Sequence, residues 1–95
     1  MGKREDYIDK FAAQLKEWSA KIDALKAKAE KETAEKKIKI KEEIEVLNKK
    51  KQESLNRLEQ VKQATEGAWE SLAEGATKAW NDLREAMQKA AEKFK

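Results

Sequence analysis

The sequence predicts an all-α fold, in the form of a coiled-coil-like antiparallel helical hairpin that self-association completes to a helical bundle. Three observations predict it. Apolar residues recur at helical spacing along almost the whole chain, strong helix formers dominate the composition, and turn-forming residues are scarce. The 95 residues contain no Pro and only three Gly, which argues against an all-β sandwich or an enzyme with many loops.

The apolar spacing is the strongest of these observations. Starting at Ile8 and stepping by three or four residues, 24 steps cover the 86 residues to Phe94, or 3.58 residues per step. This period lies between the 3.5 residues of a coiled coil and the 3.6 residues of a straight helix. Only five of the 25 positions visited are polar, so the stripe predicts packed amphipathic helices rather than a disordered chain, although 43% of the residues are charged.

The first helix is expected at about residues 4–47. Between residues 8 and 29 the apolar stripe alternates strictly between steps of three and four, which is a heptad seam. Acidic residues also precede basic ones by four positions, as in Glu17–Lys21 and Glu45–Lys49. Each such pair adds about 0.2–0.5 kcal/mol to the stability of a helix.

A turn is expected at about residues 48–54. Asn48 tolerates the left-handed conformation that ends many helices, and the lysines at 49–51 complement the negative end of the helix dipole. Ser54 is a suitable N-cap for a following helix. Polar gaps at residues 30–37 and 65–67 are alternative positions for the turn.

The second helix is expected at about residues 55–94, so that residues 1–95 form a single helical domain. Here an eleven-residue repeat appears, because Ala68-Trp69-Glu70-Ser71-Leu72 is echoed by Ala79-Trp80-Asn81-Asp82-Leu83. A turn at residue 51 would bring together residues whose numbers sum to about 102, such as Ile8 and Phe94. Two helices bury little apolar surface, which favours dimerisation into a four-helix bundle.

The apolar stripe is also the main candidate for a functional surface. Large apolar side chains, with Trp as anchors, are typical of the centre of a protein–protein interface. The predicted oligomer or partner seam consists of Phe11, Leu15, Trp18, Ile22, Leu25, Trp69, Leu72, Trp80, Leu83, Met87 and Phe94.

A run of lysines in the middle of the chain is a second candidate, a basic contact patch for phosphates or an acidic protein surface. A solvated helix face is the plainer interpretation, and no base-reading motif accompanies the lysines, so a nucleic-acid partner is not expected. The patch has a net charge of +4 once Glu42, Glu43 and Glu45 are counted, and its basic residues are Lys36, Lys37, Lys39, Lys41, Lys49, Lys50 and Lys51.

Several classes of function are not expected. The chain has no Cys and no His, which removes thiol and imidazole chemistry and the usual zinc sites, and no Gly-rich phosphate loop is present. The sequence therefore predicts no enzyme, no catalytic residue, no cofactor and no metal. With a net charge of +3, no secretory signal and no apolar run of about 18–20 residues, a soluble cytoplasmic protein is expected.

Parts of both predicted helices resemble a known group of proteins. These parts are residues 16–30, which read KEWSAKIDALKAKAE, and the segments 68–72, 78–83 and 90–95. They resemble small bacterial coiled-coil proteins of about this length, many of them catalogued as uncharacterised or stress-response proteins. The resemblance implies a soluble bacterial helical protein without known catalytic residues.

The sequence thus predicts a non-enzymatic structural or interaction protein, a self-associating amphipathic helical module that scaffolds or stabilises a larger protein assembly. Its partners are expected to be a second copy, another protein, or both. The alternative is an amphipathic helical protein that binds a lipid surface or protects against stress. A membrane surface is the less favoured partner, because residues 66–95 carry a net charge of −1.

Overall fold

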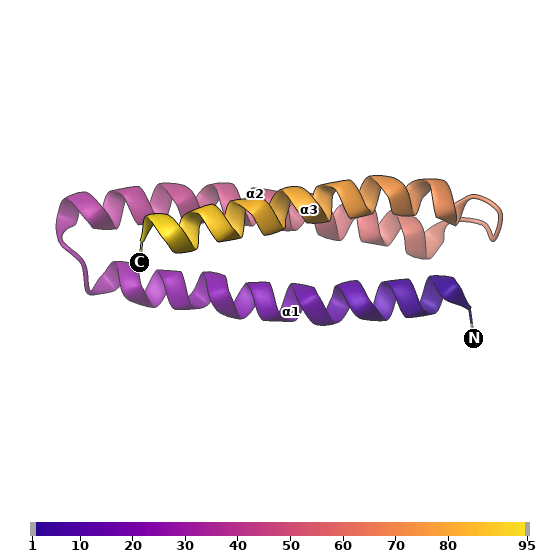
Figure 1. The fold of residues 1–95 in the computed structure, drawn as a ribbon, viewed down its shortest axis with the longest axis horizontal. Coiled ribbons are helices and arrows are strands. Elements are labelled where there is room, and N and C mark those ends of the chain that lie inside the picture. Colours follow the sequence, from indigo (N-terminus) through magenta and orange to yellow (C-terminus); the bar gives the residue numbers. More distant parts are fainter. Residues whose placement is uncertain (1, 95) are drawn as a thin grey trace.

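The computed structural model describes residues 2–94, which form three helices joined by two short turns (Figure 1). Helix α1 spans Lys3–Glu30, α2 spans Ala34–Gln63 and α3 spans Trp69–Lys93. No strand occurs within these described residues. The all-α fold predicted from the apolar spacing is therefore confirmed.

The predicted turn at residues 48–54 is wrong, because α2 continues through it without a break. This stretch contains no Gly or Pro, and the inward row of α2 keeps its spacing of three and four residues across it. That row consists of Ile40, Ile44, Leu47, Lys51, Ser54, Leu58 and Val61. Packing of apolar residues on both sides of Lys51 and Ser54 therefore outweighs the local turn signals.

The chain instead turns at both of the alternative gaps. After α1, Lys31 stays in the helical region and its N–H donates to the Lys28 carbonyl at 3.1 Å, while Thr33 is extended and precedes α2. After α2, Ala64 is extended, and the Ala68 and Trp69 N–H groups donate to the Thr65 carbonyl. Three helices of 25–30 residues thus replace the two long ones expected.

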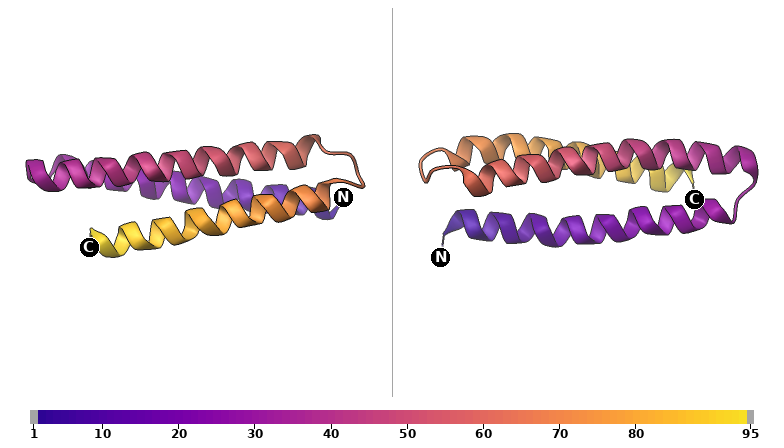
Figure 2. Two further views of the ribbon diagram at one scale, coloured as in Figure 1. Left: turned by 90° about the horizontal axis from the view of Figure 1, so that it is seen from above. Right: turned by 180° about the vertical axis from the view of Figure 1, so that it is seen from behind.

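The three helices lie lengthwise in a bundle measuring 52 × 19 × 18 Å (Figures 1 and 2). Helix α2 runs antiparallel to both neighbours, so α1 and α3 run in the same direction. The predicted pairing of Ile8 with Phe94 is therefore wrong. Ile8 packs beside Val61, Ala73 and Ala76, at the end of the bundle where α3 begins.

The core is formed by one face of each helix. Its most deeply buried members, each 0% exposed, are Leu47, Val61, Leu83 and Ala90. Helix α3 also buries Ala73, Ala76 and Ala79, and such small side chains let it approach α2 closely. Helices α1 and α3 approach each other at few points along the backbone, and large side chains fill the space between them.

Candidate functional site

A groove of about 710 Å³ lies between the parallel helices α1 and α3. Its floor is apolar and consists of Phe11, Trp18, Leu25, Trp80 and Met87. One wall, here called the α1 wall, consists of Lys10, Gln14, Glu17, Lys21, Ala24 and Lys28. The opposite α3 wall consists of Thr77, Asn81, Arg84, Gln88 and Ala91.

Helical periodicity explains why these residues share the groove. Each wall is a row of residues spaced by three or four, so its members lie on one side of their helix. Each row lies directly beside the core row of the same helix, as Lys10 lies beside Phe11 and Asn81 beside Trp80. The groove is therefore a regular feature along both helices, and its walls run beside the hydrophobic core.

Aromatic rings determine the separation of α1 and α3 at the floor. The indoles of Trp18 and Trp80 are stacked, with centroids 4.0 Å apart and an interplanar angle of 18°. The Phe11 ring meets Trp80 edge-on at 4.5 Å. Such contacts stabilise the aromatic pairs beyond the area they bury. Both indoles are nearly covered, with Trp18 7% and Trp80 6% exposed.

Tyr7 fixes the register of α1 against α3 at one end of the groove. Its hydroxyl donates to the Ala73 carbonyl at 2.7 Å and lies 2.8 Å from the Thr77 hydroxyl, which belongs to the α3 wall. Burial raises the pKa of the Tyr7 hydroxyl, and the hydrogen bond with Thr77 offsets part of this rise. The Tyr7 ring also lies between Phe11 and Trp69, with centroids 4.4 and 6.3 Å away.

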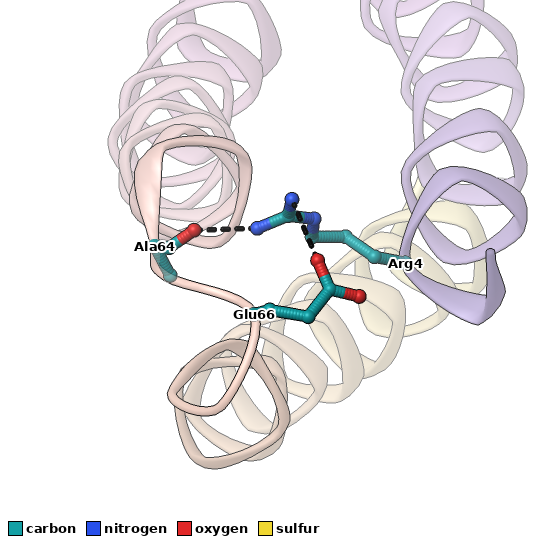
Figure 3. A network of polar contacts seen from close by, with 3 residues as sticks. All are labelled: Arg4, Ala64 and Glu66. Carbon is teal, nitrogen blue, oxygen red and sulfur yellow. Dashed lines mark hydrogen bonds and ion pairs between the residues drawn. The ribbon is translucent and has the colours of Figure 1, made fainter.

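Arg4 ties the start of α1 to the turn between α2 and α3 (Figure 3). Its guanidinium donates to the Ala64 carbonyl and forms an ion pair with Glu66 at 3.4 Å. The carbonyl at the end of α2 gains a donor in this way, since the chain leaves the helix there. Arg4 and Tyr7 together hold the N-terminal part of α1 in place beside the groove.

The groove is more basic than acidic. Lys10, Lys21, Lys28 and Arg84 face a single acidic wall residue, Glu17, so the lining carries a net charge of +3. The α3 wall is also poor in charge, since Arg84 is its only charged residue in a protein whose residues are 43% charged. An α3 wall with so little charge, beside an apolar floor, favours contact with another protein over contact with water alone.

The predicted seam residues come together, but mainly inside the chain's own bundle. Phe11, Leu15, Trp18, Ile22, Trp80, Leu83 and Met87 are buried, and Leu25, Trp69, Leu72 and Phe94 are half-buried. Five of these eleven form the floor of the groove. Because three helices share the seam, most of it is covered without a second copy, and the argument for dimerisation from two exposed helices no longer applies.

The predicted basic patch does not form one surface. All seven lysines lie on α2, but neighbours on a helix point about 100° apart, so they are spread around it. Lys37 pairs with Glu30 at 3.1 Å, and its hydrogen bond and charge lower the pKa of Glu30. Lys51 donates to Ser19 at 3.4 Å.

Two lysines of that patch instead contribute to a smaller hollow near the Lys28 end of the groove. This hollow of about 260 Å³ has Ile40 and Phe94 among its apolar residues. Its charged residues are Lys28, Glu32, Lys36, Lys39 and Lys93. Lys28 lines both the hollow and the groove, which places a cluster of positive charge at one end of the groove.

The walls of the groove were not predicted. Gln14, Asn81 and Gln88 carry no charge and lie off the apolar stripe, so a search for large apolar or clustered basic residues passes over them. A signal was present in α3, where the row from Thr77 to Ala91 interrupts an otherwise highly charged surface at helical spacing.

Comparisons with protein-family models, curated proteins and solved structures find no significant match to this chain. The resemblance to small bacterial coiled-coil proteins therefore stays a prediction. Within residues 2–94, no three acidic side chains gather in a group suited to a metal ion. No helix in this part of the chain is both long and apolar enough to cross a membrane.

Proposed function

We propose that this protein is a non-enzymatic interaction module of the cytoplasm, which stabilises a larger protein assembly by accepting a helix of another subunit in the α1–α3 groove. The groove supports this proposal. A helix that lays an apolar face into a hydrophobic groove is a common mode of protein recognition. A fourth helix between α1 and α3 would complete a four-helix bundle, the arrangement in which such cores are usually closed.

The dimensions of the groove suit a helix. Its α1 wall extends from Lys10 to Lys28, a distance of about 27 Å at 1.5 Å per residue. An occupant of about 18 residues, or five turns, would fill this length. Ala24 and Ala91 lie in opposite walls, where their small side chains leave room for the backbone of an incoming helix.

Binding to a lipid surface is the alternative function. The burial of the tryptophans favours it less than it favours binding of a helix in the groove. Trp18 and Trp80 are stacked against each other and nearly covered. A helix that lies on a membrane places such rings in the headgroup region. These rings could enter a headgroup region only if the bundle opened and lost the Trp18–Trp80 contact, whereas a helix in the groove needs only the ring edges that stay exposed along its floor.

Filling the groove tests the proposed function. A synthetic 18-residue amphipathic helix with a Leu seam and uncharged Gln flanks serves as the probe, and Trp emission of the protein reports binding. The double variant Ala24→Phe/Ala91→Phe should lower the affinity about 10-fold or more by occupying the groove. Ala20→Phe, on the exposed outer side of α1, is the matched control and should bind like the wild type.

Two results would contradict the proposal. Equal binding by the groove-filling variant and the control would place the helix elsewhere on the protein. A response to phosphatidylcholine–phosphatidylglycerol vesicles, with none to the peptide, would support the lipid alternative instead.

A further inference from the structure

We propose that the occupant of the α1–α3 groove is an acidic amphipathic helix of a different protein, an inference that rests on the proposed function. Its apolar face would lie on Trp18, Trp80 and the rest of the floor. Its flanks would carry Asp or Glu residues directed at the basic residues of the two walls. The charges of the walls, rather than the apolar floor, favour an acidic partner.

The basic residues are placed so that both flanks of a helix would meet them. Lys10, Lys21 and Lys28 lie along the α1 wall, with Glu17 as its one acidic residue between the first two, and Arg84 lies in the α3 wall opposite. The three lysines are 11 and 7 residues apart, which is about 16 and 10 Å along the helix. These intervals equal three and two helical turns, so acidic residues on one side of an incoming helix would reach them in sequence.

The end of the groove adds to this charge. Lys28 is shared with the smaller hollow, where Lys36, Lys39 and Lys93 also lie and Glu32 is the acidic residue of the lining. Lys93 is partly balanced by Glu43, which lies 3.7 Å away. The positive potential therefore continues beyond the groove at its Lys28 end, and it would attract an acidic helix before contact is made.

The same charges disfavour a second copy as the occupant. If two grooves faced each other, the basic walls of one copy would oppose the basic walls of the other, and like charges across an interface repel. The three helices of each copy are also committed to their own core. A helix from a different chain, with acidic flanks, satisfies both the apolar floor and the basic walls.

Two synthetic 18-residue helices test this inference. Both carry the same Leu and Ala seam, and one has Glu flanks where the other has Lys flanks. The Glu peptide should bind about 10-fold or more tightly than the Lys peptide at low salt, and the difference should shrink as salt is added. Quenching or a shift of the protein's Trp emission, to which Trp18 and Trp80 contribute from the groove floor, reports binding.

Neutralising the walls provides the matched comparison. The variant Lys10→Gln/Lys21→Gln/Lys28→Gln/Arg84→Gln should lose most of its preference for the Glu peptide. The control Lys16→Gln/Lys26→Gln/Lys62→Gln/Lys89→Gln removes the same charge from exposed residues that do not line the groove, and it should keep the preference. Circular dichroism of both variants establishes that the helices remain folded.

The outcomes separate this inference from the proposed function. Equal, groove-dependent binding of both peptides would overturn the inference that the partner is acidic. The proposed function, a groove that binds a helix, would still be supported. Binding of neither peptide would overturn both. A mass in sedimentation equilibrium that doubles with concentration, and that the groove-filling Phe residues abolish, would identify a second copy as the occupant and also overturn the inference.

Discussion

The indole of Trp80 on α3 stacks on that of Trp18 on α1 at 4.0 Å, although 62 residues separate them in the sequence. This contact joins the two helices that are not connected by a turn. It also forms the centre of the groove floor, so one pair of side chains both stabilises the bundle and shapes the proposed binding surface. Substitutions at this pair should therefore affect stability and binding together.

Trp80→Ala should lower the free energy of unfolding by about 3–5 kcal/mol, because a large buried ring is lost and a cavity remains. Trp80 is 6% exposed and contacts both Trp18 and Phe11. Urea titration followed by circular dichroism measures the change. Leu55→Ala is the control, since Leu55 is 38% exposed, and it should cost about 0.5 kcal/mol or less. Equal losses for the two variants would place Trp80 at the surface.

Tyr7→Phe should lower the free energy of unfolding by about 0.5–1.5 kcal/mol at neutral pH, because it removes the hydroxyl that bonds to Ala73 and Thr77. The variant keeps the ring contacts with Phe11 and Trp69, so the fold should persist. Urea titration at pH 7 measures the loss. Unchanged stability would mean that the hydroxyl does not contribute to the register of α1 against α3.

The same residue should make the stability depend on alkaline pH. The pKa of Tyr7 is raised in the folded protein, so between the unfolded and folded pKa values the unfolded chain binds fewer protons. The contribution of Tyr7 is therefore fully present below about pH 10 and is lost as the pH rises through the folded pKa. Between pH 9 and 12 the difference in stability between wild type and Tyr7→Phe should decrease. A difference that grew with pH would contradict the burial of the hydroxyl.

Ser54→Ala should raise the free energy of unfolding by about 1 kcal/mol. Ser54 is 3% exposed, and its hydroxyl has no hydrogen-bond partner among the described residues. An unsatisfied buried hydroxyl is costly, and Ala is also the better helix former. Ser71→Ala, on the exposed side of α3, gains only helix propensity and should add about 0.5 kcal/mol or less. A smaller gain at Ser54 than at Ser71 would contradict the account of the buried hydroxyl.

Gly75→Ala should raise the free energy of unfolding by about 0.5–1 kcal/mol, since Gly is a poor helix former in the interior of α3. An added Cβ would lie 3.5 Å from Nη1 of Arg57, which is an ordinary contact with the end of a flexible side chain. Thermal unfolding followed by circular dichroism measures the gain. A lower melting temperature would show that α3 and α2 are packed too closely at Gly75 to admit a methyl group.

Much of the fold is predictable from the sequence because one side of each helix is buried. The stripe residues Phe11, Leu15, Trp18 and Ile22 are all buried in the structure, as their spacing predicts. The number of helices is harder to predict. The apolar stripe has polar residues at Lys37 and Thr65, and its spacing fits three short helices as well as two long ones. A polar residue in such a stripe marks either a turn or a solvated position within a helix.

The turns illustrate this ambiguity. Asn48 and Ser54 have the residue types of a helix end, yet they lie inside α2, because Leu47 and Leu58 hold both halves of that helix against the core. Thr33, which does precede a helix, makes no side-chain capping hydrogen bond. Tertiary packing therefore decides where this chain turns, and local propensity does not.

The candidate site is predictable only in part for a related reason. Its floor belongs to the apolar stripe and is found from the sequence, whereas the groove exists because α1 and α3 are neighbours. Parallel packing of α1 and α3 requires two turns, so a two-helix prediction does not contain it. The net charge of the walls becomes visible only when Lys21 and Arg84 are placed on opposite sides of the same groove.

Nuclear Overhauser contacts of the Tyr7 ring test the parallel packing of α1 and α3 most directly, because the groove depends on this packing. In the three-helix bundle, the Tyr7 ring lies 6.3 Å from that of Trp69, centroid to centroid, so cross-peaks between their ring protons are expected. A hairpin that turns at residues 48–54 would place Tyr7 at the far end of the C-terminal helix. Cross-peaks from Tyr7 to Phe94, with none to Trp69, would contradict the bundle and the groove with it.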